Sequence, residues 1–229
     1  MSSSRFPGKS LELIGENPLA YYVVKRLERI GLPVIVATST DASDDVLVDY
    51  LEGQNILVYR GSLLNVLNRY IAAAEAFGIG EIIRVTADNP LVDIVSLMKS
   101  LSLFEKYEYV DGIYQHGLIK GSGFELVSLK ELKSIRSDNP HHLEHVTSSL
   151  RENLSQNLKY KKLPVPKYHQ FNDKIVLTCD FPEDLELLRK IFEAFDYSFS
   201  IKIEEILDFY IANPKIFQVN ARLHQFKGT

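Results

Sequence analysis

PVIVATSTDASDDVLVDYLEGQNILVYR, residues 33–60, decides the fold class because its hydrophobic period changes twice. Residues 33–39 are a short β-branched run, which is typical of a strand covered on both faces. Residues 42–52 have helical spacing, and residues 55–60 again indicate a strand. A strand, a helix and a strand in this order predict two parallel strands joined by a crossing helix.

The same alternation continues along the chain on both sides of this unit. We expect further helices at residues 19–30, 67–77, 94–104, 141–153, 185–195 and 203–211, and further strands at 81–86, 107–114, 124–128 and 175–180. This order predicts an α/β fold with a mostly parallel sheet and helices on both faces. No linker or repeat divides the chain, so residues 1–229 are predicted to form a single domain.

The composition argues against several classes of protein. The net charge of −4 and the pI near 5.9 argue against nucleic-acid binding, which usually requires a basic excess. The single cysteine, Cys179, excludes an intramolecular disulfide and suits a reducing compartment. No apolar run approaches the roughly 18 residues of a membrane span, and no signal peptide opens the chain. We therefore expect a cytoplasmic protein that binds neither nucleic acid nor membrane.

Polar residues follow several of the predicted strands, where open α/β sheets bind ligands. They lie at residues 38–41, 60–62, 86–88 and 178–180. Two of these segments end in a carboxylate, Asp88 and Asp180, and such a pair could bind Mg²⁺. Both could instead cap the helices that follow, since a proline comes two residues after each. The spacing alone favours capping.

The first residues, MSSSRFPGKS, have the composition of a phosphate-binding loop. A P-loop would need glycine at position 3, where Ser3 stands, and Pro7 removes a backbone donor from the cradle. The alternative that this loop binds phosphate through the side chains of Arg5 and Lys9 is not excluded by the pattern.

A zinc-protease pattern also occurs, as H-x-x-E-H from His141 to His145. The motif is short, no third ligand is evident and the α/β setting is wrong for it. We expect His145 to make polar contacts with a substrate or a neighbouring loop.

Seven segments occur in the order of one family. They are SSSRFPGKSL, VATSTDASDD, VYRGSLLNVLNRY, IIRVTADNPLVD, LEHVTSSLREN, LTCDFPEDLELLRKIFEA and QVNAR. They span essentially the whole chain. The chain resembles the cytidylyltransferases related to the spore-coat polysaccharide protein F, which are relatives of the CMP-KDO and CMP-acylneuraminate synthetases.

This resemblance implies a Rossmann-like nucleotide-diphospho-sugar transferase domain that activates a sugar with CTP and Mg²⁺ in surface polysaccharide biosynthesis, with a homodimer as one possible assembly. It also implies roles for particular residues. Arg5 and Lys9, beside Ser4, would hold the triphosphate, and Asp88 and Asp180 would bind the metal, which reverses the capping interpretation. Glu125 and His145 would lie at the pocket for a sugar, expected to be acidic. The base and ribose would contact Thr38, Ser39, Arg60, Gly61, Ser62 and Arg69.

The chain departs from the family pattern in three places. Where the family has the turn G-D-C-P, residues 87–90 read ADNP. Where the family has an acidic D-D-V-L-D-R-Y, residues 65–70 read NVLNRY, which leaves the base preference and the rate open. Family members also begin with an apolar strand, and Met1 aligns with its end. The resemblance thus implies that about ten residues, including the first central strand, are missing, and that the natural protein starts earlier. The alternative to an enzyme is a non-catalytic sugar- or nucleotide-binding relative, or a partner subunit.

Overall fold

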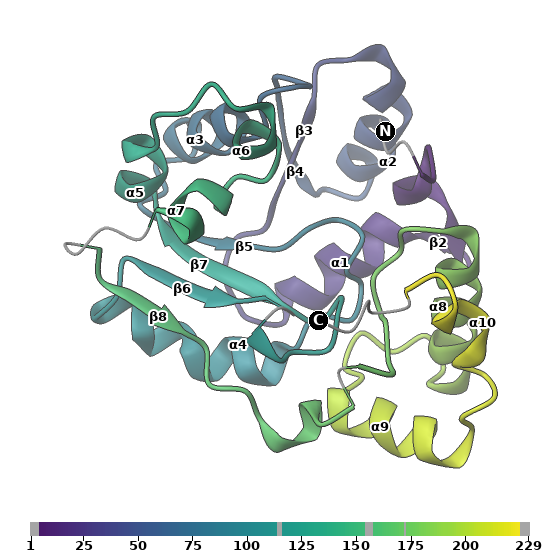
Figure 1. The fold of residues 1–229 in the computed structure, drawn as a ribbon. Coiled ribbons are helices and arrows are strands. Elements are labelled where there is room, and N and C mark those ends of the chain that lie inside the picture. The colour runs from purple at the N-terminus through teal and green to yellow at the C-terminus, as the bar shows by residue number, and fades with distance from the viewer. Residues whose placement is uncertain (1–4, 114–115, 154–157, 172, 225–229) are drawn as a thin grey trace.

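The β-α-β unit that the sequence predicts is present in the computed structural model, which describes residues 5–113, 116–153, 158–171 and 173–224. Strand β3 (Ile35–Ser39) pairs in parallel with β4 (Leu57–Gly61), and a short 3₁₀ turn, η2 (Ala42–Asp44), and helix α2 (Asp45–Gly53) connect them. Helix α1 (Leu19–Glu28) precedes the unit, and α3 (Val66–Ala76) follows it (Figure 1). Apolar residues of α1 and α2 form one buried cluster with Ile56.

A second, four-stranded sheet has the order β5-β7-β6-β8. Its strands are β5 (Glu81–Arg84), β6 (Tyr109–Gly112), β7 (Phe124–Ser128) and β8 (Tyr160–Lys162). The α/β class is confirmed, but the pairing is more mixed than predicted. Strand β7 runs antiparallel to both β5 and β6, while β6 and β8 are parallel. The alternation of helices and strands in the sequence does not show the direction of each strand, because strand direction depends on how each connection crosses the sheet.

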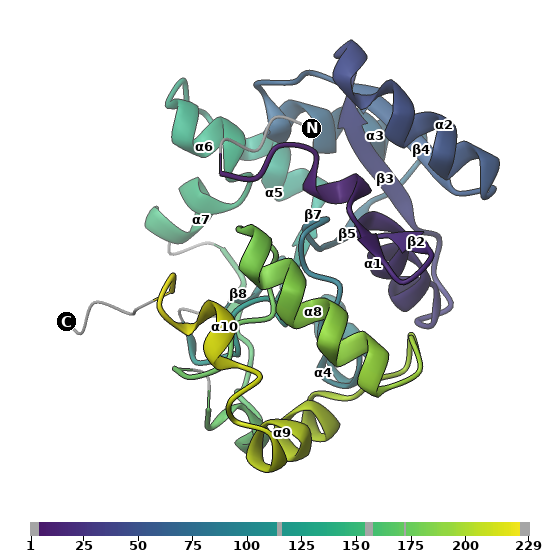
Figure 2. The same ribbon diagram turned by 90° about the vertical axis from the view of Figure 1, so that its right-hand side faces the viewer.

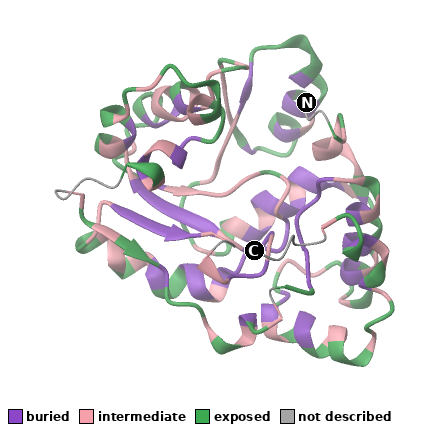
Figure 3. Cartoon of the chain, viewed as in Figure 1, coloured by how far each residue is buried: buried purple, intermediate pink, exposed green. Residues whose placement is uncertain are grey.

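Helices cover both faces of this sheet, as predicted. On one face, Tyr109 and Val127 pack against α3, α5 (Leu129–Ser134) and α7 (Ser148–Glu152). On the other face, Val110 and Leu126 pack against α4 (Ile94–Ser100) and the 3₁₀ turn η3 (Leu101–Glu105). Neighbouring residues of β6 and β7 therefore point to opposite faces, and both strands are buried along most of their length (Figure 3).

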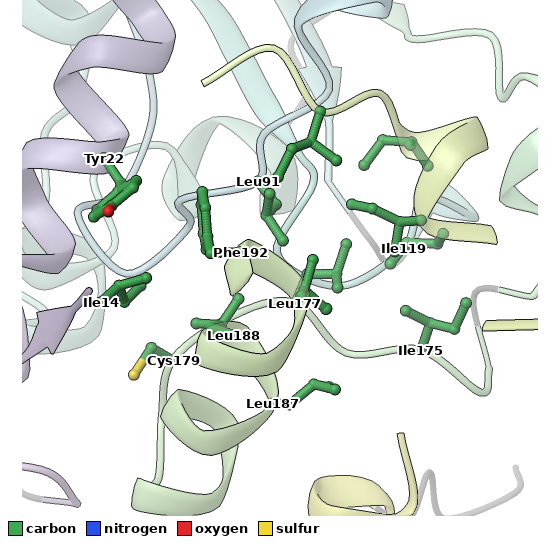
Figure 4. Packing of buried hydrophobic residues seen from close by; sticks show 14 of the residues in the cluster. Ile14, Tyr22, Leu91, Ile119, Ile175, Leu177, Cys179, Leu187, Leu188 and Phe192 are labelled. Carbon is green, nitrogen blue, oxygen red and sulfur yellow. The ribbon is translucent and has the colours of Figure 1, made fainter. Parts of the chain in front are cut away.

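The C-terminal helices form a separate layer, visible in the turned view of Figure 2. It contains α8 (Pro182–Ala194), α9 (Ile203–Ala212) and α10 (Gln218–Ala221). The largest buried cluster lies here, where Leu177 and Cys179 face α8 (Figure 4). Short elements complete the described chain: η1 (Lys9–Leu11), β1 (Leu13–Ile14), β2 (Asn17–Pro18), α6 (Pro140–Glu144) and η5 (Lys167–His169).

Two predicted elements differ in the structure. Residues 175–180 belong to no ladder, because their backbone bonds go to two loops. The Leu177 N–H donates to the Lys120 carbonyl at 2.7 Å, and the Cys179 N–H donates to the Asp88 carbonyl at 2.9 Å. The helix predicted at 141–153 is divided into α6 and α7, since His145 leaves helical geometry with a ψ of 51°. No helix in the described ranges is long and apolar enough to cross a bilayer.

The two sheets do not join. Among the described strands, β3 pairs only with β4, and β5 pairs only with β7. A cavity of about 470 Å³ lies between β3 and β5. Strand β3 is therefore half-buried along residues 35–37, although the sequence predicts a strand covered on both sides.

Candidate active site

The polar residues that follow the strands gather at one edge of the molecule. Arg84, at the end of β5, places its guanidinium 5.9 Å from the centre of the Tyr70 ring. The neighbouring Arg69 donates to the carbonyl of Ser62, just beyond β4, at 2.8 Å. The carboxyl ends of β4 and β5 therefore lie together, and the amino end of the antiparallel β7 brings Glu125 to the same edge. This edge is where open α/β sheets bind ligands.

Lys9 lies between two carboxylates that are far apart in the sequence. Its Nζ is 2.6 Å from Asp88 Oδ2 and 3.3 Å from Asp180 Oδ1, and it donates to the Cys179 carbonyl at 2.6 Å. The guanidinium of Arg5 reaches the same Asp180 oxygen at 3.2 Å. The structure thus brings Arg5, Lys9, Asp88 and Asp180 into one group, which we call the acid–lysine centre.

The electrostatics of this centre favour charged side chains. Burial opposes the charge of Lys9, whose side chain is 13% exposed, but Asp88 and Asp180 outweigh burial and raise its pKa. Burial would also raise the pKa of Asp180, yet Lys9, Lys120 and Arg5 together lower it. Lys9 and Asp180 therefore remain charged at neutral pH.

The capping interpretation of Asp88 and Asp180 is wrong. Helix α4 is capped by Asp93, whose side chain accepts from the Ser96 backbone, and α8 begins after Phe181. The Asp180 and Phe181 N–H groups both donate to Asp184 Oδ2, at 2.8 and 2.9 Å. Since Asp184 satisfies these backbone donors, the Asp180 carboxylate can face the cations.

Asp184 is a positioning residue that the sequence analysis missed. It is 1% exposed, and its other oxygen is 2.7 Å from Asn220 Nδ2 and 2.8 Å from His224 Nε2. His224 Nδ1 lies 3.1 Å from Lys120 Nζ, which approaches Asp180 at 3.4 Å. An Asp three residues into a helix that begins with proline was the available signal.

The residues predicted to contact base and ribose also lie together, at the ends of β3 and β4. The hydroxyls of Thr38 and Ser39 each donate to Asp44 Oδ2 at 2.6 Å, so they organise the turn that follows β3. Burial opposes the charge of Asp44, but these hydroxyls help to lower its pKa. Arg60 donates to the Ser39 and Asp41 carbonyls and pairs with Asp45 at 2.7 Å.

Gly61 ends β4 and Ser62 follows it, and both lie against Arg69. A Cβ at Gly61 would lie 3.0 Å from Arg69 Cγ, so glycine allows Arg69 to pack against the end of β4. The Nε of Arg69 is buried and has no hydrogen-bond partner among the described residues. Ser4, the remaining predicted contact of the nucleotide, lies outside the described residues.

Glu125 is the centre of a buried ion cluster. It is 1% exposed, with Oε2 at 2.5 Å from Arg84 and Oε1 at 2.8 Å from Arg151. The hydroxyls of Tyr109 and Thr147 also donate to Oε1, at 2.6 and 2.7 Å. Both oxygens of the carboxylate are thus hydrogen-bonded, and Glu125 positions two arginines at the edge of the sheet.

Among the described residues, no hydrogen bond joins His145 to Glu125. His145 is exposed, and its ring lies 4.5 Å from that of His141. No group of three or more His, Cys, Asp or Glu residues in the described chain is arranged to bind a metal, so the zinc-protease pattern has no zinc site there. Asp88 and Asp180 do fit Mg²⁺, because both direct oxygen toward one positive charge and Mg²⁺ usually takes one or two carboxylates plus phosphate oxygens.

Asp111 lies opposite Glu125 on β6 and is fully buried. Neither of its carboxylate oxygens accepts a hydrogen bond of good geometry within the described chain, although His116 Nδ1 lies 3.5 Å from Oδ2. Burial and the negative charge of Glu125 raise the pKa of Asp111 to about 6. Because the folded-state pKa lies above the unfolded value of about 3.9, the charged form costs stability, and this cost grows as the pH rises from about 4 to 6.

We therefore expect Asp111→Asn to be more stable than the wild type at about pH 7.5, by roughly 1–3 kcal/mol, and equal to it near pH 4. Urea unfolding at both pH values measures the difference. Asp49→Asn, on the exposed surface of α2, is the matched control. It should leave the free energy of unfolding unchanged at both pH values. A gain of the same size at both pH values would contradict the assigned cause.

Comparison with known proteins identifies the family. A family model described as Cytidylyltransferase matches residues 1–216. The chain belongs to the cytidylyltransferase family. This membership shows that the protein is an enzyme of the nucleotidyltransferase class.

This cytidylyltransferase is 26% identical to the spore coat polysaccharide biosynthesis protein SpsF of Bacillus subtilis, over 93% of this chain and 92% of that protein. It is 29% identical to the 8-amino-3,8-dideoxy-manno-octulosonate cytidylyltransferase of Shewanella frigidimarina, over 88% of this chain and 84% of that one. A solved cytidylyltransferase from Leptospira borgpetersenii serovar Hardjo-bovis superimposes with a TM-score of 0.86 at 28% identity, covering 95% and 93% of the two chains. The Rossmann-like nucleotidyltransferase fold is thereby confirmed.

Proposed function

We propose that this cytidylyltransferase transfers CMP from CTP to a sugar and releases pyrophosphate. The observation that carries the proposal is the acid–lysine centre, in which Lys9 bridges Asp88 and Asp180 beside Arg5. Cations that bind phosphate and carboxylates that bind a metal are both needed for nucleotidyl transfer, and here they lie at one edge of the sheet.

In the proposed mechanism, Arg5 and Lys9 bind the triphosphate oxygens and Thr38, Ser39, Arg60 and Arg69 position the nucleoside. Asp88 and Asp180 would hold Mg²⁺, which offsets negative charge on the phosphates when bound. A sugar oxygen attacks the α-phosphorus in line, the bond to the bridging oxygen of the β-phosphate breaks, and pyrophosphate leaves with that electron pair. The sugar hydroxyl loses its proton to solvent. Catalysis then consists of positioning and charge neutralisation.

We propose an acidic sugar as the acceptor, with a role in surface polysaccharide biosynthesis. The names of the Bacillus and Shewanella relatives support this class, since one refers to spore coat polysaccharide and the other to an octulosonate. The test is Mg²⁺-dependent pyrophosphate release from CTP with a mixed pool of acidic sugars. Release in the complete mixture, and none without the sugars, is the expected result. No release from folded protein with any sugar would contradict the proposal.

The base preference can be measured separately. We expect CTP with Mg²⁺ to raise the melting temperature more than ATP, GTP or UTP, because a ligand that binds only the native state stabilises it. Arg60→Gln should reduce the CTP shift, since Arg60 organises the ends of β3 and β4. An equal or larger shift with ATP would contradict the assignment of the pyrimidine pocket.

A second candidate is a non-catalytic sugar- or nucleotide-binding protein. The gap between β3 and β5 favours it, because the described strands then form no continuous sheet behind the site. This candidate predicts a thermal shift with CTP and no pyrophosphate release, so the two measurements distinguish it from the enzyme.

A further inference from the structure

Helix α10 lies beside α8, the helix that follows Asp180 (Figures 1 and 2). It belongs to the segment QVNAR, residues 218–222, to which the proposed reaction gives no role. Among the described residues of this helix, only Asn220 is buried, with 2% of it exposed. A buried amide costs stability unless it is hydrogen-bonded, so the partners of Asn220 indicate what the segment does.

Asn220 and His224 lie four residues apart and bind the same oxygen atom. Asn220 Nδ2 donates to Asp184 Oδ1 at 2.7 Å. His224 Nε2 is 2.8 Å from the same Oδ1, and its side chain is 5% exposed. The other oxygen of Asp184 accepts the N–H groups of Asp180 and Phe181. Asp184 thus joins the C-terminal segment to the backbone that carries Asp180.

His224 also closes a ring of contacts around Asp180. Its Nδ1 is 3.1 Å from Lys120 Nζ, and this Nζ is 3.4 Å from Asp180 Oδ2. Because an ammonium group can only donate, Nδ1 is the acceptor, and the neutral imidazole of His224 carries its proton on Nε2. The imidazole therefore accepts from Lys120 and donates to Asp184. Through Asp184, the contacts return to the N–H of Asp180.

This ring distinguishes the two oxygens of the Asp180 carboxylate. Lys120 approaches Oδ2, whereas Lys9 approaches Oδ1 at 3.3 Å. The loop of Lys120 is itself held closely, because a Cβ at Gly121, where φ is 93°, would lie 2.2 Å from the Thr178 backbone nitrogen. Asp180 is thus fixed at its backbone and at one oxygen, and its other oxygen is directed toward Lys9.

We propose that the C-terminal segment is part of the active site, and that Asn220 and His224 are positioning residues for Asp180. They act through Asp184 and Lys120. This inference rests on the proposed function, since Asp180 is a carboxylate assigned there to Mg²⁺. Residues that orient a metal-binding group change metal affinity or activity by about 10–100-fold when they are replaced. Without His224, Asp184 loses a donor and Lys120 loses an acceptor, so the direction of the Asp180 carboxylate is less well fixed.

The test compares the binding of CTP in excess Mg²⁺ with its binding in a metal chelator, by isothermal titration calorimetry on the full chain. No sugar is added, so the measurement needs no turnover. The wild type should bind CTP more tightly with Mg²⁺. His224→Leu should weaken binding with Mg²⁺ by about tenfold or more and leave binding in the chelator unchanged. Asn220→Leu should show the same difference, and the melting temperature shows that each variant is folded.

Two further variants separate positioning from packing. His224→Gln should bind CTP with Mg²⁺ nearly as the wild type does, because a glutamine amide can donate to Asp184 and accept from Lys120. Gln218→Leu replaces a polar by an apolar residue on the exposed side of α10 and should have no effect. Amide hydrogen exchange localises the change, since the N–H groups of Asp180 and Phe181 should exchange about tenfold faster in His224→Leu than in the wild type.

Several outcomes would overturn the inference. A lower melting temperature with wild-type binding of CTP and Mg²⁺ would give the segment a structural role alone. Equal weakening with and without Mg²⁺ would contradict an effect through Asp180, as would a wild type that binds CTP equally well in both conditions. Failure of His224→Gln to restore binding would contradict the two hydrogen bonds. Pyrophosphate release is not used here, so the inference and the proposed function can fail separately.

Discussion

Asp88→Asn and Asp180→Asn are each expected to lower kcat by about 10²–10³-fold while the fold stays intact. Each change keeps the shape of the side chain but removes an anionic oxygen from the group around Lys9, at 2.6 Å for Asp88 and 3.3 Å for Asp180. Neither carboxylate caps a helix, so the loss should fall on turnover and metal dependence rather than on folding.

Pyrophosphate release at saturating CTP, measured over a range of Mg²⁺ concentrations, checks this prediction. Both variants should need more Mg²⁺ to reach half of their maximal rate, and their melting temperatures should stay near that of the wild type. Asp49→Asn again serves as the exposed control. Wild-type turnover in both variants would refute the assignment of these carboxylates to the reaction.

Glu125→Gln should produce the largest loss of stability, about 3–5 kcal/mol in the free energy of unfolding. The carboxylate is 1% exposed and compensates two arginines, Arg84 and Arg151. Glutamine would leave both guanidinium charges without a buried counter-ion, and its amide would direct a donor at one of them. Burial opposes the charge of Glu125, but Arg84 and Arg151 outweigh burial and lower its pKa, so the charge that is lost is present at neutral pH.

Urea unfolding at neutral pH measures this difference. Glu108→Gln is the matched control, because Glu108 pairs with the exposed Lys130 and such surface pairs contribute at most about 1 kcal/mol. If Glu125→Gln cost no more than Glu108→Gln, the two arginines would have to be compensated by other groups, and the central role of Glu125 would be wrong.

Much of the fold could be predicted from local patterns. The strands at residues 33–39 and 81–86 and the helices near 67–77 and 185–195 occur close to their predicted positions, because hydrophobic periodicity is a property of neighbouring residues. The direction of β7 could not be predicted in this way. The prediction of a strand at residues 175–180 was wrong, because a segment becomes a strand only when another strand pairs with it.

The residues of the candidate site also differ in whether the sequence could identify them. Arg5, Lys9, Asp88 and Asp180 could be named from the sequence, since each lies in a short segment with a recognisable composition or at the end of an apolar run. Arg151 could not, because its partner Glu125 is distant in the sequence. For Asp184 the only signal was its place in the first turn of α8, since Asn220 and His224 are also distant in the sequence.

By itself, the sequence determined which segments are helical or extended and which ionisable residues follow the strands, because these depend on neighbours along the chain. Only the tertiary structure decided what those residues do. Spacing favoured Asp88 and Asp180 as helix caps, and the fold instead brings Lys9 between them. Likewise, an apolar run predicts β3 without saying what lies beside it, and the folded chain leaves one side of β3 facing a cavity. Burial, charge pairing and strand pairing are contacts between segments, and no local pattern specifies them.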